Sequence, residues 1–188
     1  SRLLQQTRAP AVLLEVRGKA GGDSAGPIDK LGTLARFFTP QGIVAWNNGF
    51  AVADSGNNVI RFIDYDGNVT TLAGDLSLAA LSHELELEVD NYGFADGTGA
   101  LVRFHFPTAL AVDEAGDLLI SDTLNGAVRK LAAASKEVTT VATGFVRPAG
   151  LAVGLDKSIY VADFNRHSIY RIVDGHPVLL AGSNSPFE

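Results

Sequence analysis

Short apolar runs alternate with polar turns along most of the chain, and the alternation recurs three times. In the first copy the apolar runs are GIVA (42–45), FAVAD (50–54), VIRFI (59–63) and NVTTLAG (68–74). Such runs, separated by Gly, Asn and Asp, are typical of strands joined by tight turns. Because the repeats show no sustained 3.6-residue period, each copy is predicted to form four antiparallel strands.

The three copies are in register, and each has an aligned proline followed 14 or 15 residues later by an aligned aspartate. The copies span 35–74, 102–144 and 145–182; the prolines are Pro40, Pro107 and Pro148, and the aspartates are Asp54, Asp122 and Asp163. A period of about 40 residues indicates an array, a solenoid or a propeller. Four strands per copy favour one propeller blade per copy.

The repeat resembles the NHL repeat, which has Arg-Phe before the proline, a strand ending in Ala-Asp, a following Asn, then Asp-Gly and Val-Thr-Thr-Leu-Ala-Gly. The second copy departs from this pattern at Ala109 and over 132–135, and the third has Arg166 in place of the turn Asn. The first copy matches at Arg36, Phe37, Pro40, Gly42, Ala53, Asp54, Asn57, Asn58, Ile60, Arg61, Asp66, Gly67, Val69, Thr70, Thr71, Leu72, Ala73 and Gly74. The resemblance implies an all-β fold, a β-propeller of NHL type.

A leader of the form Gly-x-x-Asp-Gly-x-Gly precedes Arg-Phe in this family. It is present at 93–104 and more loosely at 21–37.

The number of blades leaves the closure of the propeller open. AVLLEVRGKAGG (11–22) resembles the last strand of a partial blade, so three four-stranded blades and one extra N-terminal strand are expected. Closed propellers have about 4 to 8 blades, and uncovered strand edges tend to pair. The propeller is therefore expected to be part of a larger one, to be open with covered edges, or to be completed by association of two chains. The single domain 1–188 divides into a partial-blade strand (10–22), blades (34–74, 99–144 and 145–182), an insertion with leader (75–98) and a tail (183–188).

One insertion interrupts the repeat. The interval from Pro40 to Pro107 is 67 residues, whereas that from Pro107 to Pro148 is 41. Within the excess, DLSLAALSHELELEVDNY (75–92) has an apolar stripe that predicts a short amphipathic helix, although LELEV also alternates like a strand. The stripe is Leu78, Leu81, Leu85 and Val89.

Long loops in compact domains are usually functional or disordered, which makes 75–92 the first candidate for an interaction surface. A cap over an edge or face of the propeller is the alternative role. The polar candidates for contact with a partner are His83, Glu84, Glu86, Glu88 and Asp90.

Charge argues against nucleic acid and membrane as partners. The formal net charge is −6, with a pI near 5.1, so the surface is not built to neutralise phosphates or anionic lipid. No apolar run approaches the roughly 18 residues of a membrane helix. RNA-binding NHL domains use a positive face, but the cations here mostly recur at repeat positions, where arginine bridges strands or blades. They are Arg36, Arg61, Arg103, Arg129, Lys130, Arg147 and Arg166.

No catalytic residue, metal site or cofactor is predicted. Cysteine is absent, which excludes disulfides and thiolate metal sites, and the four histidines form no HExxH or close pair. The histidines are His83, His105, His167 and His176. Propeller lyases that amidate peptides have a zinc ligand directly after the repeat proline, where this chain has Gln41, Thr108 and Ala149. The calcium-binding glutamate of gluconolactonase-like propellers has no counterpart, and the aligned aspartates are expected to fix turns.

The sequence thus predicts a non-catalytic scaffold that binds a protein, peptide or glycan through loops on one propeller face and through 75–92. The alternative is a divergent propeller hydrolase or lyase that needs residues from blades absent here. Asn68-Val69-Thr70 is a glycosylation sequon, although the repeat itself produces Asn-Val-Thr-Thr. NHL-type propellers occur as membrane-anchored ectodomains, which implies an extracellular or cell-surface location.

Overall fold

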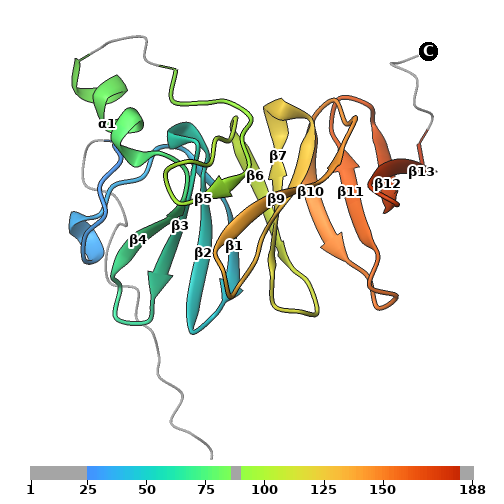
Figure 1. The fold of residues 1–188 in the computed structure, drawn as a ribbon, viewed down its shortest axis with the longest axis horizontal. Coiled ribbons are helices and arrows are strands. Elements are labelled where there is room, and N and C mark those ends of the chain that lie inside the picture. The colour runs from blue at the N-terminus through green and yellow to red at the C-terminus, as the bar shows by residue number, and fades with distance from the viewer. Residues whose placement is uncertain (1–24, 86–89, 183–188) are drawn as a thin grey trace, which may run out of the picture.

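The computed structural model describes residues 25–85 and 90–182, which form three antiparallel sheets in succession along the chain (Figure 1). Blade 1 comprises β1 (Pro40–Trp46), β2 (Gly49–Asp54), β3 (Val59–Asp64) and β4 (Val69–Ala73). Blade 2 comprises β6 (Pro107–Val112), β7 (Leu118–Asp122), β8 (Ala127–Leu131) and β9 (Glu137–Thr143), with the short β5 (Gly97–Thr98) beside β9. Blade 3 comprises β10 (Pro148–Val153), β11 (Ile159–Asp163), β12 (Ser168–Val173) and β13 (His176–Ala181). The predicted all-β fold of three blades is confirmed, and β5 is a strand that the repeat pattern did not predict.

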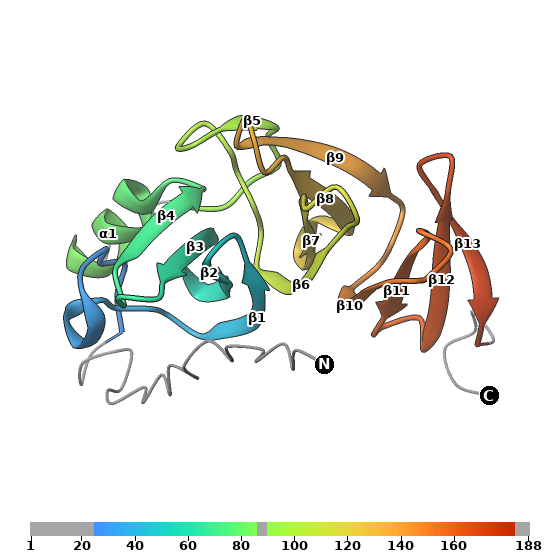
Figure 2. The same ribbon diagram turned by 90° about the horizontal axis from the view of Figure 1, so that it is seen from below.

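The three blades fan out side by side, with β1, β6 and β10 on the inside of the fan and β4, β9 and β13 towards the outside (Figure 2). The inner strand β6 contacts both β1 and β10. Within each blade the four repeat strands pair in chain order, because every connection between them is a short turn. The described part of the chain is an open arc of propeller blades.

Apolar side chains are buried mainly between neighbouring blades. Trp46 from β1 packs edge-on against Phe62 and donates from Nε1 to the carbonyl of Gly116 in blade 2, at 2.8 Å. The ammonium group of Lys136 lies 4.5 Å from the centre of the Trp46 ring. Two buried clusters therefore hold the arc together, one between blades 1 and 2 and one between blades 2 and 3. Each blade depends on its neighbours for burial, as in other repeat proteins.

A single glycine sets the distance between the first two inner strands. A Cβ atom at Gly42 would lie 2.2 Å from the carbonyl oxygen of Thr108 in β6. Real Cβ atoms do not approach an oxygen so closely, so β1 reaches β6 only because residue 42 has no side chain.

The insertion forms a helix, α1 (Leu76–Leu85), as the apolar stripe predicted. Asp75 begins it, since its Oδ1 accepts hydrogen bonds from the backbone N–H groups of Ser77 and Leu78. Ala79 is fully buried, whereas Leu78 of the predicted stripe is half-buried. Val89, the strand-like residues 86–89, the expected N-terminal strand 10–22 and the tail 183–188 lie outside the described residues. Among the described helices, none has the length and apolar character needed to cross a membrane.

Candidate functional site

A buried aspartate fixes the turn between the second and third strands of blades 1 and 2. Asp54 accepts hydrogen bonds from the backbone N–H of Phe38 at 2.7 Å and from the Asn57 amide at 2.8 Å, and thereby holds the 3-10 turn η2 (Ser55–Asn57). Asp122 accepts the same two bonds, from His105 N–H and Asn125, and holds η3 (Thr123–Asn125). These contacts are the turn-fixing role that the repeat implies for the aligned aspartates.

Each of these aspartates also forms a fully buried ion pair. Arg61 Nη1 lies 2.8 Å from Asp54 Oδ2, and Arg129 Nη1 lies 2.8 Å from Asp122 Oδ2, with no exposed area on any of the four side chains. Burial raises the pKa of both aspartates, against the opposing effect of the hydrogen bonds from Asn, backbone N–H and guanidinium. Desolvation is thus the dominant electrostatic cost of these pairs, and we attribute to them a positioning role rather than a large net gain in stability.

The same arginines attach the leader to its blade. Arg61 donates to Asp29 Oδ1 at 2.9 Å and to the carbonyl of Ile28 at 2.8 Å. Arg129 repeats both contacts, to Asp96 at 3.1 Å and to the carbonyl of Ala95 at 2.7 Å. Since both guanidinium groups are buried, neither arginine is available to a nucleic-acid phosphate. The two leaders are therefore integral parts of the blades that they precede.

Asp96 is the exposed end of this network in blade 2. Partial burial raises the pKa of Asp96, but hydrogen bonds from Arg129 and from the N–H and hydroxyl of Thr140 outweigh it, so the pKa lies below its usual value. The carboxylate is therefore held in its charged form as it joins the leader to β9 and β8.

Blade 3 has no leader, since its copy of the repeat follows the second copy directly, and it has no arginine at the position of Arg61 and Arg129. Tyr170 stands at the position of Arg61 and Arg129, and its ring packs edge-on against Phe145 with centroids 5.9 Å apart. Asp163 still accepts hydrogen bonds from the backbone N–H groups of Val146 and Arg147, at 2.7 and 2.9 Å, and from that of Arg166 in the turn, at 3.4 Å. An apolar contact thus replaces the ion pair where no leader carboxylate is present.

The turns fixed by these aspartates all open at one end of the blades, the upper end in Figure 1, where α1 also lies. We call this end the loop face. Four large apolar side chains beside the turn aspartates are exposed there. They are Tyr92, 46% exposed, Leu124, 48%, Val146, 48%, and Phe164, 62%.

The segment after α1 is attached to the loop face between blades 1 and 2. The Asn58 amide donates to Asn91 Oδ1 at 2.8 Å and accepts from the N–H of Phe106 at 2.7 Å. The Tyr92 ring stacks on His105, with centroids 4.3 Å apart and planes 16° apart. Arg103 forms an ion pair with Asp75 at 3.1 Å. These contacts place the end of the insertion next to the turn of blade 2.

Of the five predicted contact residues, Asp90 is the one whose side chain the structure describes. It is exposed, and its hydrogen bond raises the pKa of Tyr92. His83 and Glu84 lie in α1, with side chains outside the description, and Glu86 and Glu88 lie outside the described residues.

The remaining predicted chemistry is dispersed. In the part of the chain that the structure describes, no three His, Asp or Glu side chains come together as a metal site would require. The hydroxyl of Thr108 lies 2.6 Å from that of Thr123, and Gln41 is exposed. His167 and His176 are both exposed, and His176 begins β13.

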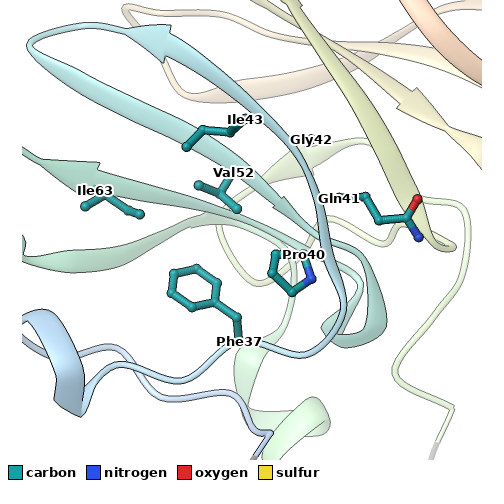
Figure 3. Close-up of a pocket in the computed structure, with 7 residues that line it drawn as sticks. All are labelled: Phe37, Pro40, Gln41, Gly42, Ile43, Val52 and Ile63. Atoms are coloured by element: carbon teal, nitrogen blue, oxygen red, sulfur yellow. The ribbon is translucent and has the colours of Figure 1, made fainter. Parts of the chain in front are cut away.

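A hollow of about 260 Å³ lies on the outward side of blade 1 (Figure 3). No ionisable side chain lines it, so its walls offer apolar contact rather than acid–base chemistry. Figure 3 shows the Gln41 amide directed away from Phe37 and Ile63. The lining residues are Phe37, Pro40, Gln41, Gly42, Ile43, Val52 and Ile63.

The predicted glycosylation site lies in the exposed turn between β3 and β4. Asn68 donates from its amide to Asp64 Oδ2 at 2.8 Å and from its backbone N–H to Asp64 Oδ1, also at 2.8 Å. These hydrogen bonds hold the pKa of Asp64 below its usual value.

Comparison with curated proteins gives two relatives of equal identity. The chain is 28% identical to NHL repeat-containing protein 2 from Bos taurus over 157 residues, which cover 72% of the chain and 21% of that protein. It is 28% identical to Protein SUPPRESSOR OF QUENCHING 1, chloroplastic, from Arabidopsis thaliana over 137 residues, which cover 65% of the chain and 12% of that protein. The chain therefore spans a minor part of the length of these relatives. No protein-family model matches the chain.

The solved structures that it resembles are β-propellers at low sequence identity. A gluconolactonase from Xanthomonas campestris aligns with a TM-score of 0.56 at 15% identity, over 84% of this chain and 50% of its own. Virginiamycin B lyase from Staphylococcus aureus aligns with a TM-score of 0.53 at 17% identity, over 78% of this chain and 43% of its own. An auxiliary nutrient binding protein from Bacteroides ovatus aligns with a TM-score of 0.53 at 21% identity, over 68% of this chain and 35% of its own. Together with the three in-register repeats, these similarities confirm that the chain is built of β-propeller blades of the NHL type.

Proposed function

We propose that the chain is a non-catalytic binding module whose loop face takes a protein, peptide or glycan, and that it acts outside the cell or at the cell surface. The observation that carries the proposal is the set of exposed apolar side chains on this face, with Tyr92, Leu124 and Phe164 as its most prominent members. Large apolar groups gathered at one end of a fold are typical of an interaction surface.

The backbone that carries these side chains is firmly held. Leu124 lies in η3, whose ends are fixed by Asp122, and its N–H donates to the carbonyl of His105 at 3.0 Å. Phe164 follows Asp163, and its N–H donates to the carbonyl of Arg147 at 2.9 Å. A surface that is ordered before binding loses less conformational entropy when a ligand arrives, which favours affinity.

The side chains suit both proposed ligand types. Aromatic rings supply a flat apolar surface that packs against peptide side chains or the apolar face of a sugar ring. The guanidinium of Arg147 lies 5.3 Å from the centre of the Phe164 ring, which adds hydrogen-bond donors beside the apolar surface. The auxiliary nutrient binding protein, the lyase and the gluconolactonase all share with this chain the fold alone, and they illustrate binding and catalysis as two uses of it.

A screen for ligands tests the proposal. The purified chain is applied to a glycan array and to a phage-displayed library of random peptides, and retained probes are titrated by calorimetry. In parallel, turnover of a lactone and of a peptidyl-hydroxyglycine is measured with and without added zinc or calcium. We expect a retained glycan or peptide and no turnover.

Turnover that disappears when a single described residue is substituted would contradict the proposal in favour of a propeller hydrolase or lyase. The same holds for a chain that retains no probe and turns over either substrate.

A further inference from the structure

The leader of blade 2 pairs with its own blade along one edge of an extended segment, 90–96. Gly93 donates from its backbone N–H to the carbonyl of Phe104 at 3.0 Å, and Ala95 exchanges two backbone hydrogen bonds with Arg103, at 3.3 and 3.1 Å. The carbonyls of Gly93 and Ala95 also accept hydrogen bonds from side chains of blade 2, each at 2.7 Å. This edge of the segment is therefore fully paired.

The opposite edge of the same segment is unpaired. Successive residues of an extended chain direct their backbone groups to alternate sides, so the N–H and C=O groups of Tyr92 and Phe94 point away from those of Gly93 and Ala95. Neither Tyr92 nor Phe94 forms a backbone hydrogen bond with another described residue. The two residues are 46% and 53% exposed, so solvent reaches their backbone. We call the backbone of Tyr92 and Phe94 the leader edge.

The leader of blade 1 has no such edge. It pairs with its own blade in the same way, through Gly26 and Ile28. The residue between them is Pro27, which stands where the second leader has Phe94. Proline has no N–H to donate, and it is one of the residues by which proteins block an exposed strand edge. Of the two leaders, the second alone presents a complete set of backbone donors and acceptors.

The side chains beside the leader edge determine which strand fits it. Asp90, Tyr92 and Phe94 are all exposed and, at alternate positions, lie on one face of the segment. Tyr92 stacks on the His105 ring with centroids 4.3 Å apart, and the guanidinium of Arg129 lies 4.7 Å from the centre of the Phe94 ring. Each aromatic ring is thus held on one side and open on the other. Asp90 adds an exposed carboxylate next to them.

We propose that the leader edge binds an extended segment of another protein by antiparallel strand addition. Such a strand exchanges pairs of backbone hydrogen bonds with Tyr92 and with Phe94. Its residues opposite the two rings are β-branched or aromatic, because these cross-strand pairs are favourable. A lysine or arginine lies opposite Asp90, and the net charge of −6 favours a basic partner. The inference rests on the proposed function only in so far as Tyr92 belongs to both surfaces.

Amide hydrogen exchange, followed by NMR, tests whether the edge is open. In the free chain the N–H groups of Tyr92 and Phe94 should exchange at least about tenfold faster than those of Gly93 and Ala95, because hydrogen-bonded amides are protected. Equal protection of the four amides would mean that the edge is already covered within the chain, and it overturns the proposal.

A short peptide tests strand addition itself. The probe is acetyl-Thr-Val-Thr-Val-Thr-Lys-amide, whose antiparallel register places the valines opposite Phe94 and Tyr92 and the lysine opposite Asp90. In an NMR titration we expect shifts of the Tyr92 and Phe94 amides that saturate at millimolar peptide. Methylation of both valine nitrogens should weaken binding by about tenfold or more, because these nitrogens donate to the edge. Methylation of the second and third threonine nitrogens, which point away from the edge, is the matched control and should leave binding nearly unchanged.

Substitutions in the chain separate this site from the turns of the loop face. Phe94→Pro gives the second leader the residue that blocks the first and should abolish the shifts, whereas Phe94→Ala keeps the N–H and should still bind. The NMR spectrum of each variant establishes that it is folded. Leu124→Ser and Phe164→Ser should bind the peptide like the unmodified chain.

Three results would overturn strand addition. They are the absence of shifts at Tyr92 and Phe94, equal binding of the two methylated peptides, and full binding by a folded Phe94→Pro. None of them removes the proposed function, since a glycan or peptide that is retained in the screen and lost in Leu124→Ser would still support the loop face. Failure of that screen together with binding of the probe peptide would leave the leader edge as the binding site and contradict the loop face.

Discussion

Arg61 and Asp54 form an ion pair with 2.8 Å between Nη1 and Oδ2, and neither side chain has any exposed area. The pair links the turn η2, which lies on the loop face, to the leader of blade 1, because Arg61 also contacts Asp29 and Ile28. It recurs in blade 2 as Arg129 and Asp122. The loop face is therefore supported from beneath by charged groups that do not reach solvent.

Removal of the cation should destabilise the fold strongly. Arg61→Met leaves Asp54 buried and unpaired, a change expected to lower the free energy of unfolding by about 3–5 kcal/mol. Arg171→Met is the matched control, because Arg171 is half-exposed and lies 4.0 Å from Asp156, a surface pair worth about 0–1 kcal/mol. Urea denaturation of both variants measures the difference. Equal losses would show that the buried pair does not hold the blade.

The close approach of β1 and β6 predicts a second stability effect. Gly42→Ala places a Cβ atom against the Thr108 carbonyl and is expected to cost about 1–3 kcal/mol, since the strands must separate. Gly26→Ala is the control, because the nearest atom to its new Cβ lies at 3.7 Å. Thermal and urea unfolding should leave Gly26→Ala close to the unmodified chain. A neutral Gly42→Ala would contradict the packing of blade 1 on blade 2.

The lowered pKa of Asp96 predicts a dependence of stability on pH. Because the folded state binds the Asp96 proton less tightly than the unfolded chain, whose pKa is 3.8, this carboxylate contributes stability above pH 3.8 that is lost as pH falls towards the lowered value. Asp96→Asn should therefore destabilise the chain at neutral pH and lose that effect in acid. Unfolding curves of the two proteins at a series of pH values give the comparison. If the two proteins differ by the same free energy of unfolding at every pH, the charge of Asp96 does not contribute to stability.

A secretory route predicts modification of Asn68. The side chain is exposed in the turn between β3 and β4, and Asn68-Val69-Thr70 is the one sequon of the chain. Secreted expression in a eukaryotic host should add a glycan that a peptide N-glycosidase removes, with a corresponding change in mass. Thr70→Ala should abolish the modification while Asn68 keeps its hydrogen bonds to Asp64. Unmodified Asn68 in the secreted protein would argue against the proposed location.

Strand positions could be predicted from the sequence because each apolar run faces a neighbouring blade and each polar break is a tight turn. The bridging role of Arg61 and Arg129 was predicted, but their ion pairs with the buried turn aspartates were not, since each arginine falls inside an apolar strand. A signal was present: Arg61 and Arg129 both stand seven residues after the aligned aspartate, and both of their blades carry a leader aspartate, Asp29 or Asp96. Blade 3 has Tyr170 at this position and no leader.

The candidate site was predicted only in outline. The insertion was identified by the broken period, but the four exposed apolar residues of the loop face come from four separate segments of the chain. Leu124 and Phe164 are single apolar residues in the polar turns that follow the aligned aspartates, and such a residue does not by itself indicate a binding surface. Their exposure depends on how the blades stack, and the hydrophobic pattern of the sequence does not predict that arrangement.

Calorimetric titration of loop-face variants tests the central claim most directly, with a glycan or peptide retained in the screen as the probe. Phe164→Ser and Leu124→Ser should each weaken binding by about tenfold or more, as expected for exposed apolar groups at the centre of a contact. Leu155→Ser, in the fully exposed turn between β10 and β11, should bind like the unmodified chain. Loss of binding confined to the loop-face variants is the predicted result. Unchanged affinity in Phe164→Ser and Leu124→Ser would contradict the assignment of function to this face.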